Sequence, residues 1–183
     1  MTLTVDENIR LELTAEKFAA ELYKAADKNR VHLSEFLPWV PFMQSEEDMR
    51  KYLKNCELLF EQGQEISFII IANESIIGRI GLNHIDRVNK NASIGYWIIK
   101  NAEGKGITSK SCEMLIRYGF QKLGLQRIEI RAATTNLKSQ AIPKRFCFSQ
   151  EGILRQAELV NHQFLDLVVF SVLKEEWEKR KAF

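Results

Sequence analysis

The sequence has few cysteines and no long hydrophobic run, and both shortages exclude classes of protein. Its three cysteines are an odd number in 183 residues, and they lie far apart among apolar neighbours, so we expect reduced, buried thiols rather than a disulfide framework. No window approaches the roughly 18 consecutive apolar residues of a membrane helix, and no charged segment followed by an apolar run marks an export signal. We therefore expect a cytoplasmic protein without membrane contact. The cysteines are Cys56, Cys112 and Cys147.

An excess of charge of one sign is also missing. The 26 Lys and Arg residues and 24 Asp and Glu residues give a formal net charge of +2. They are interleaved along the chain, so no basic face predicts binding to nucleic acid. The three histidines are scattered and form no short metal-ligand pattern with cysteine, so we expect no metal site. The length suffices for one well-filled core, and no linker or repeat divides the chain, so residues 1–183 are expected to form a single domain.

Glycine is scarce, with nine residues in the chain, and two of them lie in the most informative segment. A predicted strand that ends near Ile99 runs through Gly104-Lys105-Gly106 directly into a predicted helix. Glycine lets the backbone amides converge on one point, and the first turn of a helix adds N–H groups without an intrahelical acceptor. We expect a diphosphate at this loop; the alternative for an isolated Gly-x-Gly is a tight turn that binds nothing. Neither the P-loop nor the dinucleotide fingerprint fits, because Ile99, Gly106 and Ser109 depart from those patterns.

Hydrophobic periodicity predicts strands and helices in alternation. Thr14 is the expected N-cap of a first helix, Ser45 opens a second helix in a near capping box, and Gly63 and Gly124 are stop signals. Antiparallel hairpins thus meet a βαβ unit at the glycine loop. The expected strands cover residues 8–13, 65–72, 76–85, 92–99, 127–133, 153–160 and 164–173; the expected helices cover 15–31 and 175–181, and others begin at Ser45, after the glycine loop and at Asn136.

Several short motifs occur together in the order found in one enzyme superfamily. They are Leu37-Pro38-Trp39, Asn101-Ala102-Glu103-Gly104-Lys105-Gly106, Leu123-Gly124-Leu125-Gln126-Arg127-Ile128-Glu129, Asn136-Leu137-Lys138-Ser139, Lys144-Arg145-Phe146-Cys147-Phe148 and Glu151-Gly152. With them, the chain from Asn8 to Trp177 resembles the GNAT superfamily of acetyl-CoA-dependent N-acetyltransferases, and within it the Rim type, which acetylates the N-termini of ribosomal proteins. The resemblance implies an α+β (mixed α/β) GNAT acyl-CoA N-acyltransferase fold, with a mixed central sheet of about seven strands flanked by helices.

Three residues depart from the family's pattern. Asn101 replaces the usual Gln or Arg, Cys147 stands where Gly is common, and Pro143 falls inside the expected helix after Asn136. Because proline lacks a backbone donor, we expect Pro143 to bend or break that helix.

The resemblance implies acetyl-CoA as the co-substrate and no metal. Its diphosphate would lie on the amides of residues 104–108, and its pantetheine arm would pair with exposed backbone of Trp97 and Ile99, where two neighbouring strands splay apart. Lys105 and either Lys144 or Arg145 are candidate partners for the phosphates, with a solvated lysine as the alternative. The expected cofactor-binding residues are Trp97, Ile98, Ile99, Gly104, Lys105, Gly106, Ile107, Thr108 and Asn136.

The resemblance also suggests how the acetyl group is transferred. A backbone N–H near Ile98 or Ile99 would polarise the thioester carbonyl. Glu158 matches the family's general base, with a solvated carboxylate on a strand as the alternative, and Ser139 matches its general acid, with a helix cap as the alternative. Trp39 and Phe42 are expected to line the acceptor pocket unless they belong to the core.

These observations predict an N-acetyltransferase that transfers an acetyl group from acetyl-CoA to a primary amine by direct attack in a ternary complex. The acceptor would be the N-terminal amine of a protein, in particular a ribosomal protein, because an α-amino group, with a pKa of about 7.7 to 8.0, deprotonates more readily than lysine, at about 10.4. Two alternatives stay open: a small amine such as a polyamine or an aminoglycoside, and a non-catalytic module that binds coenzyme A. Family habit also suggests a homodimer.

Overall fold

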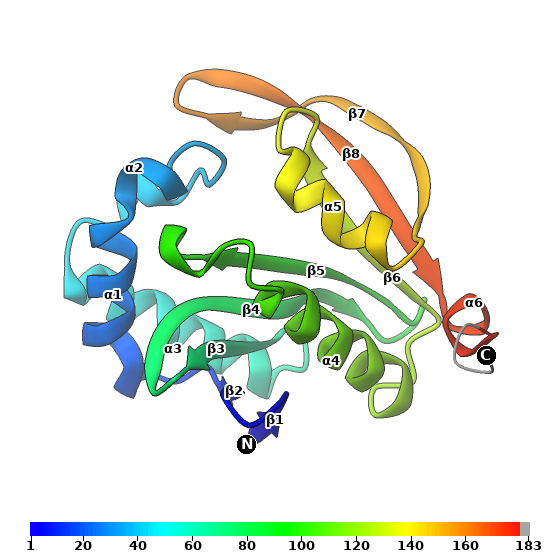
Figure 1. Cartoon of the computed structure of the whole chain (residues 1–183), viewed down its shortest axis with the longest axis horizontal. Coiled ribbons are helices and arrows are strands. Elements are labelled where there is room, and N and C mark those ends of the chain that lie inside the picture. The colour runs from blue at the N-terminus through cyan, green and yellow to red at the C-terminus, as the bar shows by residue number, and fades with distance from the viewer. Residues whose placement is uncertain (180–183) are drawn as a thin grey trace.

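The computed structural model describes residues 1–179, which form an eight-stranded sheet with helices on both faces (Figure 1). The expected α+β class is confirmed, and the sheet has one strand more than expected, because β1 pairs with β2 at the N-terminal edge. The strands are β1 (Thr2–Thr4), β2 (Ile9–Leu13), β3 (Ile66–Ala72), β4 (Ser75–Asp86), β5 (Asn91–Ile98), β6 (Arg127–Ala133), β7 (Ser149–Val160) and β8 (Gln163–Leu173). The α-helices are α1 (Ala19–Lys28), α2 (Arg30–Leu33), α3 (Glu46–Glu61), α4 (Ile107–Gln121), α5 (Leu137–Arg145) and α6 (Lys174–Lys179), and the 3₁₀ helices are η1 (Glu16–Phe18), η2 (Val40–Phe42) and η3 (Lys100–Ala102).

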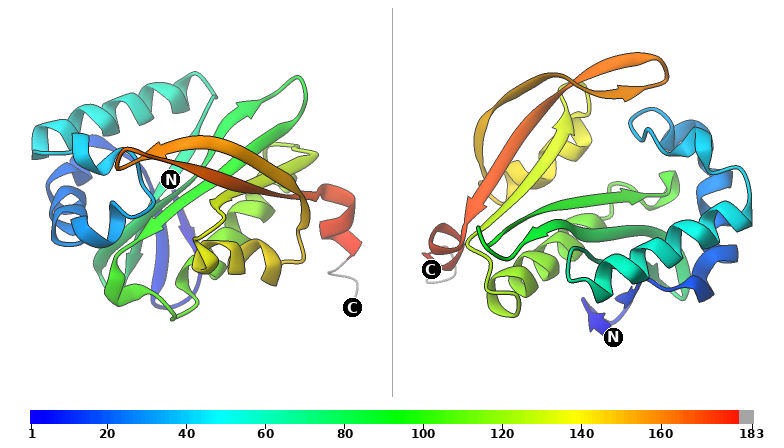
Figure 2. Two further views of the ribbon diagram at one scale, coloured as in Figure 1. Left: turned by 90° about the horizontal axis from the view of Figure 1, so that it is seen from above. Right: turned by 180° about the vertical axis from the view of Figure 1, so that it is seen from behind.

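Two apolar layers cover the two faces of the sheet. Strand β3 is buried along its whole length, and its side chains alternate between the layers, as the period of two of a strand requires. Phe68 and Ile70 belong to the layer under α4 and α5, whereas Ile69 and Ile71 belong to the layer under α1 and α3. Figures 1 and 2 show α4 and α5 on one side of the sheet and α3 on the other.

The sheet opens between β5 and β6, its one parallel pair among the described strands. The strand order is β1-β2-β3-β4-β5-β6-β8-β7. Only residues 91–93 of β5 pair with β6, at residues 127–129. Beyond them β5 follows β4 as far as Ile98, and β6 follows β8 as far as Ala133. The two strands therefore diverge, as the right-hand view of Figure 2 shows, and this confirms the splayed strands that the resemblance implied.

The helix signals were correct for α3 and wrong for the first helix. Ser45 Oγ accepts the N–H of Asp48 at 3.1 Å, so Ser45 caps α3 as predicted. Thr14 caps no helix: it is buried, and its Oγ1 accepts a hydrogen bond from Ser67 Oγ at 3.1 Å. The continuous helix expected over residues 15–31 is divided into η1, α1 and α2. At the other end of the chain, residues 180 and 181 of the expected last helix lie outside the described residues.

Of the two outcomes expected for Pro143, a bend or a break of its helix, the break does not occur. The helix continues through Pro143 to Arg145. In an α-helix the N–H of residue 143 would bond to the carbonyl of residue 139, and proline has no N–H to donate. The Ser139 carbonyl instead accepts the hydroxyl of Tyr96 at 3.0 Å, so its hydrogen bond comes from outside the helix.

Cys147 lies at the surface, although all three cysteines were expected to be buried. Cys56 and Cys112 are buried as predicted. Cys147 is exposed because it follows the C-cap residue of α5 with φ 49°, the left-handed conformation in which helices often end. The Phe148 N–H, which donates to the Pro143 carbonyl at 2.9 Å, completes this helix end. Glycine, which the family often has here, adopts this conformation without strain.

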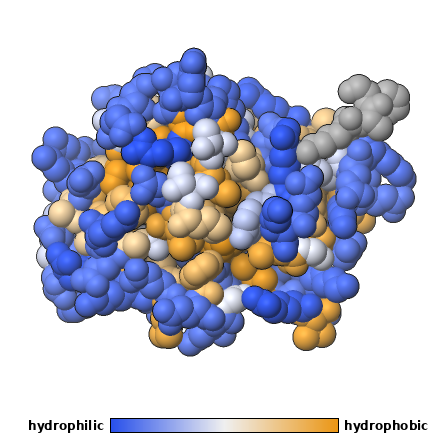
Figure 3. Space-filling model, turned by 90° about the horizontal axis from the view of Figure 1, so that it is seen from below, coloured by the Kyte–Doolittle hydropathy of each residue, from blue (hydrophilic) through white to orange (hydrophobic). Residues whose placement is uncertain are grey.

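The surface of the molecule is mostly hydrophilic, with apolar side chains in restricted places. On the face that carries the N-terminal strands, hydrophobic groups gather at the centre of a hydrophilic rim (Figure 3). The β7–β8 hairpin also exposes large apolar side chains, namely those of Ile153, Leu154, Leu159 and Phe164. Over residues 1–179, no helix has the length and hydrophobicity needed to cross a lipid bilayer, and no group of three or more potential metal ligands is present.

A buried ion pair joins β4 to the segment that follows α3. The Arg79 guanidinium is buried and forms a salt bridge with Glu65. Its Nη2 also lies 3.2 Å from Cys56 Sγ, and its Cζ lies 5.1 Å from the centre of the Tyr52 ring. Glu65 is the carboxylate that compensates this charge, so the fold depends on it.

We expect Glu65→Ala to lower the free energy of unfolding by about 3 to 5 kcal/mol, because it leaves the Arg79 charge buried without a carboxylate. Glu61→Ala, at an exposed position at the end of α3, should change it by no more than about 0.5 kcal/mol. Urea denaturation of the two variants and the parent protein measures both values. A loss below about 1 kcal/mol in Glu65→Ala is typical of a solvent-exposed ion pair, and it would contradict the conclusion that Glu65 compensates a buried charge.

Candidate active site

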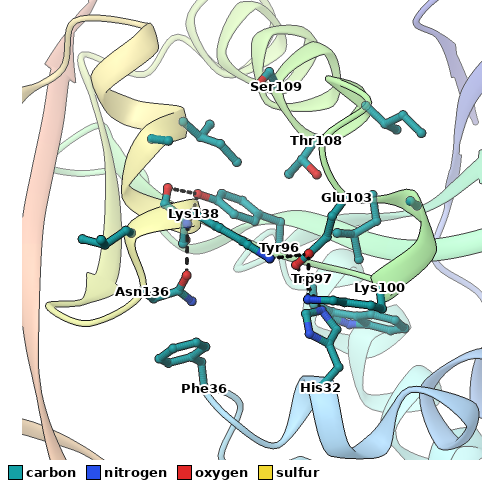
Figure 4. Close-up of a pocket in the computed structure, with 18 of the residues that line it drawn as sticks. His32, Phe36, Tyr96, Trp97, Lys100, Glu103, Thr108, Ser109, Asn136 and Lys138 are labelled. Atoms are coloured by element: carbon teal, nitrogen blue, oxygen red, sulfur yellow. Dashed lines mark hydrogen bonds and ion pairs between the residues drawn. The ribbon is translucent and has the colours of Figure 1, made fainter.

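A cavity of about 870 Å³ lies where β5 and β6 diverge. Its walls come from α2 and the residues after it, the end of β5, the glycine loop, the first turn of α4, and α5 (Figure 4). This volume is within the range of roughly 300 to 1,000 Å³ that is typical of sites for small molecules. The cavity therefore combines segments that are far apart in the sequence into one candidate site.

The glycine loop forms one end of the cavity. Gly104 and Gly106 both have φ 74°, and Gly106 is the N-cap residue of α4. A Cβ atom at either position would meet no atom within 4 Å, so the space in front of this backbone is open. The first N–H groups of α4 are directed toward this end, where Ile107 and Thr108 line the cavity. This geometry fits the diphosphate of coenzyme A, because backbone amides and the positive end of a helix dipole attract anions.

The strand backbone that faces the gap belongs to Tyr96 and Ile98. The Ile99 N–H donates to the Ile77 carbonyl of β4 at 2.8 Å. Since backbone groups alternate in direction along a strand, those of Trp97 also face β4, and those of Tyr96 and Ile98 face the gap. The backbone groups of Trp97 and Ile99, which were expected to be exposed to pantetheine, thus face β4, and those of Tyr96 and Ile98 are the ones that border the gap. Of the two N–H groups considered for the oxyanion, that of Ile98 is the one directed toward the cavity.

The candidate phosphate-binding cations differ in their position. Lys105 is exposed and is not among the residues that line the cavity. Lys144 is directed elsewhere, because its Nζ lies 3.3 Å from Gln140 Oε1 and 5.9 Å from the centre of the Phe170 ring. Arg145 lines the cavity, so the structure favours it over Lys144.

Ser139 and Asn136 both lie in the first turn of α5, with separate roles. The cap of α5 is Asn136, whose Oδ1 accepts the Ser139 N–H at 3.0 Å. The Ser139 side chain is therefore not the helix cap considered as an alternative. Its Oγ donates to the hydroxyl of Tyr96 at 3.1 Å, and both residues line the cavity (Figure 4). Sequence reasoning missed Tyr96, because a tyrosine within a strand gives no separate signal.

Glu158 lies on the β7–β8 hairpin, near its tip. It is half-buried, and burial raises the pKa of its carboxyl above the ordinary value, which suits a proton acceptor better than a solvated carboxylate would. Glu158 does not line the cavity in this structure. The hairpin tip is nevertheless held beside α2, because Asn161 Nδ2 donates to the carbonyl of Ser34 at 2.7 Å. Residues 33 and 35, next to Ser34, line the cavity.

Trp39 and Phe42 do not line the cavity as predicted. Trp39 packs against Trp97, with ring centres 5.8 Å apart, and belongs to the apolar layer under α1 and α3. Phe42 is 80% exposed on η2. Phe36 and Leu37, a short way before Trp39 in the chain, line the cavity in their place.

Four charged or titratable residues that sequence reasoning missed meet at the front of the cavity. The Glu103 carboxylate lies 2.6 Å from Lys138 Nζ, 3.2 Å from Lys100 Nζ and 3.3 Å from His32 Nε2 (Figure 4). Burial alone would raise the pKa of Glu103, but hydrogen bonds from Lys138 and Lys100 outweigh it and hold the pKa below its ordinary value. The pattern could not be found in the sequence, because the four residues come from three separate segments.

Comparisons with known proteins agree with this geometry. Residues 9–149 match the family model described as the acetyltransferase (GNAT) domain. The chain is 35% identical over 170 residues to the ribosomal-protein-serine acetyltransferase of Escherichia coli strain K12, covering 93% of this chain and 95% of the relative. It superimposes with a TM-score of 0.91 on the ribosomal L7/L12 α-N-protein acetyltransferase RimL in complex with coenzyme A, at 27% identity, covering 94% and 98% of the two chains. The microcin C7 self-immunity acetyltransferase MccE, solved with acetyl-CoA and AMP, is 30% identical with a TM-score of 0.88, covering 92% and 94%.

We expect Gly106→Ala to weaken acetyl-CoA binding by about tenfold, a loss of about 1.4 kcal/mol, because its Cβ enters the space in front of the α4 amides. Gly124→Ala is the matched control, since Gly124 has φ 67° and equally open surroundings but does not line the cavity. Both variants should lose about 1 to 2 kcal/mol of stability through backbone strain. Calorimetric titration with acetyl-CoA separates them, and equal affinities would show that the diphosphate binds elsewhere.

The raised pKa of Glu158 predicts a dependence of stability on pH. The folded protein holds the proton of the Glu158 carboxyl more tightly than the unfolded chain, whose glutamate pKa is about 4.3. The protein therefore loses stability as the pH rises from the unfolded pKa to the higher folded pKa. Glu158→Gln should therefore raise the melting temperature above the folded pKa and leave it unchanged below about pH 4. Thermal unfolding between about pH 3 and 8 tests this, with the exposed Glu61→Gln as the control. Parallel curves for Glu158→Gln and the parent protein would refute the prediction.

Proposed function

This chain belongs to the GNAT acetyltransferase family and is an acetyl-CoA-dependent acetyltransferase, and from this premise we propose that its acceptor is the N-terminal α-amino group of a ribosomal protein. The observation that carries the proposal is the likeness over nearly the full length to enzymes named for that reaction, at 35% identity in one case and a TM-score of 0.91 in another. The cavity supports it with a glycine loop and a helix N-terminus that fit the diphosphate of the donor.

The residues of the cavity, together with Glu158 of the β7–β8 hairpin, can perform direct transfer. Bound acetyl-CoA supplies a thioester, whose carbonyl oxygen would accept the Ile98 N–H. Glu158 accepts a proton from the acceptor ammonium, whose pKa of about 7.7 to 8.0 makes it a suitable partner for a carboxylate of raised pKa. The neutral amine forms the C–N bond as the C–S bond breaks. Ser139 then donates its hydroxyl proton to the thiolate, and the attacking nitrogen returns a proton to Ser139.

This assignment requires Glu158 to come closer to the cavity than the structure places it. The hairpin that carries Glu158 is irregular: residues 155–157 of β7 lie opposite a single residue of β8, and the Gln156 N–H donates to Asp166 Oδ1 at 2.7 Å. Such a bulge redirects the end of a strand.

A small amine is the second candidate acceptor. MccE, whose structure holds AMP beside acetyl-CoA, shows that a chain of the same fold has a site for a small molecule. The ionic cluster at the front of this cavity, with Glu103 between two lysines, offers both signs of charge to such a ligand. The N-terminal amine remains our proposal because the ribosomal-protein-serine enzyme is 35% identical over 93% of this chain, whereas the spermidine N(1)-acetyltransferase of Escherichia coli strain K12 is 23% identical over 62% of it.

The cellular setting follows from the proposed acceptor. Ribosomal proteins are made in the cytoplasm, so we place the reaction there. We also propose a homodimer, for which the exposed apolar side chains of the β7–β8 hairpin offer a surface.

We expect a peptide with a free N-terminal serine and an internal lysine to gain one acetyl group, located on the α-amino nitrogen. The same peptide with a blocked N-terminus should gain none, because only the lysine, with a pKa of about 10.4, is left. Mass spectrometry with fragmentation assigns the modified nitrogen, and a polyamine serves as the small-amine substrate. Acetylation of the polyamine alone would favour the second candidate. Binding of acetyl-CoA without turnover of any amine would contradict the enzymatic assignment.

A further inference from the structure

The hydroxyl of Tyr96 makes two hydrogen bonds to the same residue of α5. It donates to the Ser139 carbonyl at 3.0 Å and accepts from Ser139 Oγ at 3.1 Å. Tyr96 belongs to β5, so these bonds cross the gap between the two halves of the sheet. The contact lies within the cavity, in front of the Tyr96 and Ile98 backbone that faces the gap. A tyrosine in this place can control the orientation of the serine.

Pro143 leaves the Ser139 carbonyl without its intrahelical donor. In a regular helix the Ser139 carbonyl would accept the N–H of residue 143, and in this chain that residue has none. The carbonyl is thereby left for a donor outside the helix, and Tyr96 supplies it. Once the Tyr96 proton points to the carbonyl, the lone pairs of its oxygen are left to accept the Ser139 hydroxyl.

We propose that Tyr96 is a positioning residue, which holds Ser139 Oγ in one side-chain rotamer at the wall of the cavity, and that Pro143 favours this contact by leaving the Ser139 carbonyl without its intrahelical donor. The inference rests on the proposed role of Ser139 in acetyl transfer. Serine hydroxyls otherwise rotate among three staggered orientations. Fixing one of them before the reaction removes a cost from the transfer step.

Tyr96 itself is not a source of protons. Burial raises the pKa of its phenol above the ordinary value, so the phenol stays neutral where an α-amino group titrates. The proton balance is thus complete without it. Ser139 releases its hydrogen bond to the Tyr96 oxygen as its Oγ proton passes to the thiolate, the attacking nitrogen returns one proton to Ser139, and the Tyr96 O–H bond stays intact.

The test is Tyr96→Phe, which removes the hydroxyl and keeps the ring. We expect kcat to fall by about tenfold or more, with the KM for acetyl-CoA unchanged within about twofold, because the donor seat is at the glycine loop. Tyr118→Phe is the matched control: Tyr118 is a half-buried tyrosine of α4 whose hydroxyl lies 3.9 Å from Met1 Sδ, outside the cavity. It should leave both constants unchanged.

A double-mutant cycle with Ser139→Ala separates positioning from general support of the fold. If Tyr96 acts through the serine hydroxyl, the double variant is no slower than Ser139→Ala alone. Ser139→Thr, which keeps a hydroxyl, should recover part of the rate only while Tyr96 is present. The same cycle on the free energy of unfolding without acetyl-CoA should also be non-additive, because the two hydroxyls bond to each other.

Two results would overturn the inference. One is an unchanged kcat in Tyr96→Phe, and the other is a pair of rate losses that multiply in the double variant. The unfolding cycle requires no substrate, so it tests the contact even if the proposed acceptor is wrong. Failure of the acceptor proposal would show instead in the parent protein, as turnover of a different amine or none.

Discussion

Three paired positions between β5 and β6 hold the two halves of the sheet together, and the site depends on their being so few. If the parallel ladder continued, the backbone of Tyr96 and Ile98 would be bonded to β6 and no N–H could face a thioester. Because the ladder ends at Ser93, those groups face a cavity that α5 and the glycine loop enclose. The cost of leaving strand backbone unpaired is offset only when a ligand or water bonds to it, which connects the architecture of the sheet to the binding of a co-substrate with amide groups.

The same gap explains why a proline is tolerated inside α5. A proline in a helix interior costs about 3 kcal/mol, partly because one carbonyl loses its donor. Here the Tyr96 hydroxyl reaches that carbonyl from the opposite wall of the gap. The carbonyl that lost its donor to Pro143 on α5 is therefore bonded by a tyrosine that the divergence of β5 from β6 leaves free to reach it. A substitution of Tyr96 should therefore affect the stability of α5 around Pro143, and a substitution of Pro143 should affect the hydrogen bond of Tyr96. A tyrosine elsewhere on the sheet would have no such carbonyl to reach.

Sequence reasoning predicted features that depend on neighbouring residues in the chain, and it failed for features that depend on a partner far away in the sequence. The strand pattern, the Ser45 cap and the glycine loop depend on neighbours in the chain, and the structure agrees with each. Thr14 is a residue type that often caps helices, but its hydroxyl accepts a hydrogen bond from Ser67 in the interior instead. The length of β1 is three residues, too short for alternation to be recognised. Within the site, the resemblance identified Ser139, while its partner Tyr96 could be found only by placing β5 beside α5.

The positions of the acid and base candidates indicate which part of the site is complete before the acceptor binds. Ser139, the Ile98 backbone and the glycine loop all border one cavity and are held by α5, β5 and α4. Glu158 instead belongs to an exposed hairpin whose tip is tied to the segment after α2 by the Asn161 side chain. The proposed donor half is thus held by the sheet and its helices, whereas the proposed base lies on the β7–β8 hairpin. Since Glu158 does not line this cavity, the proposed proton transfer requires the hairpin to bring its carboxylate closer to the donor half.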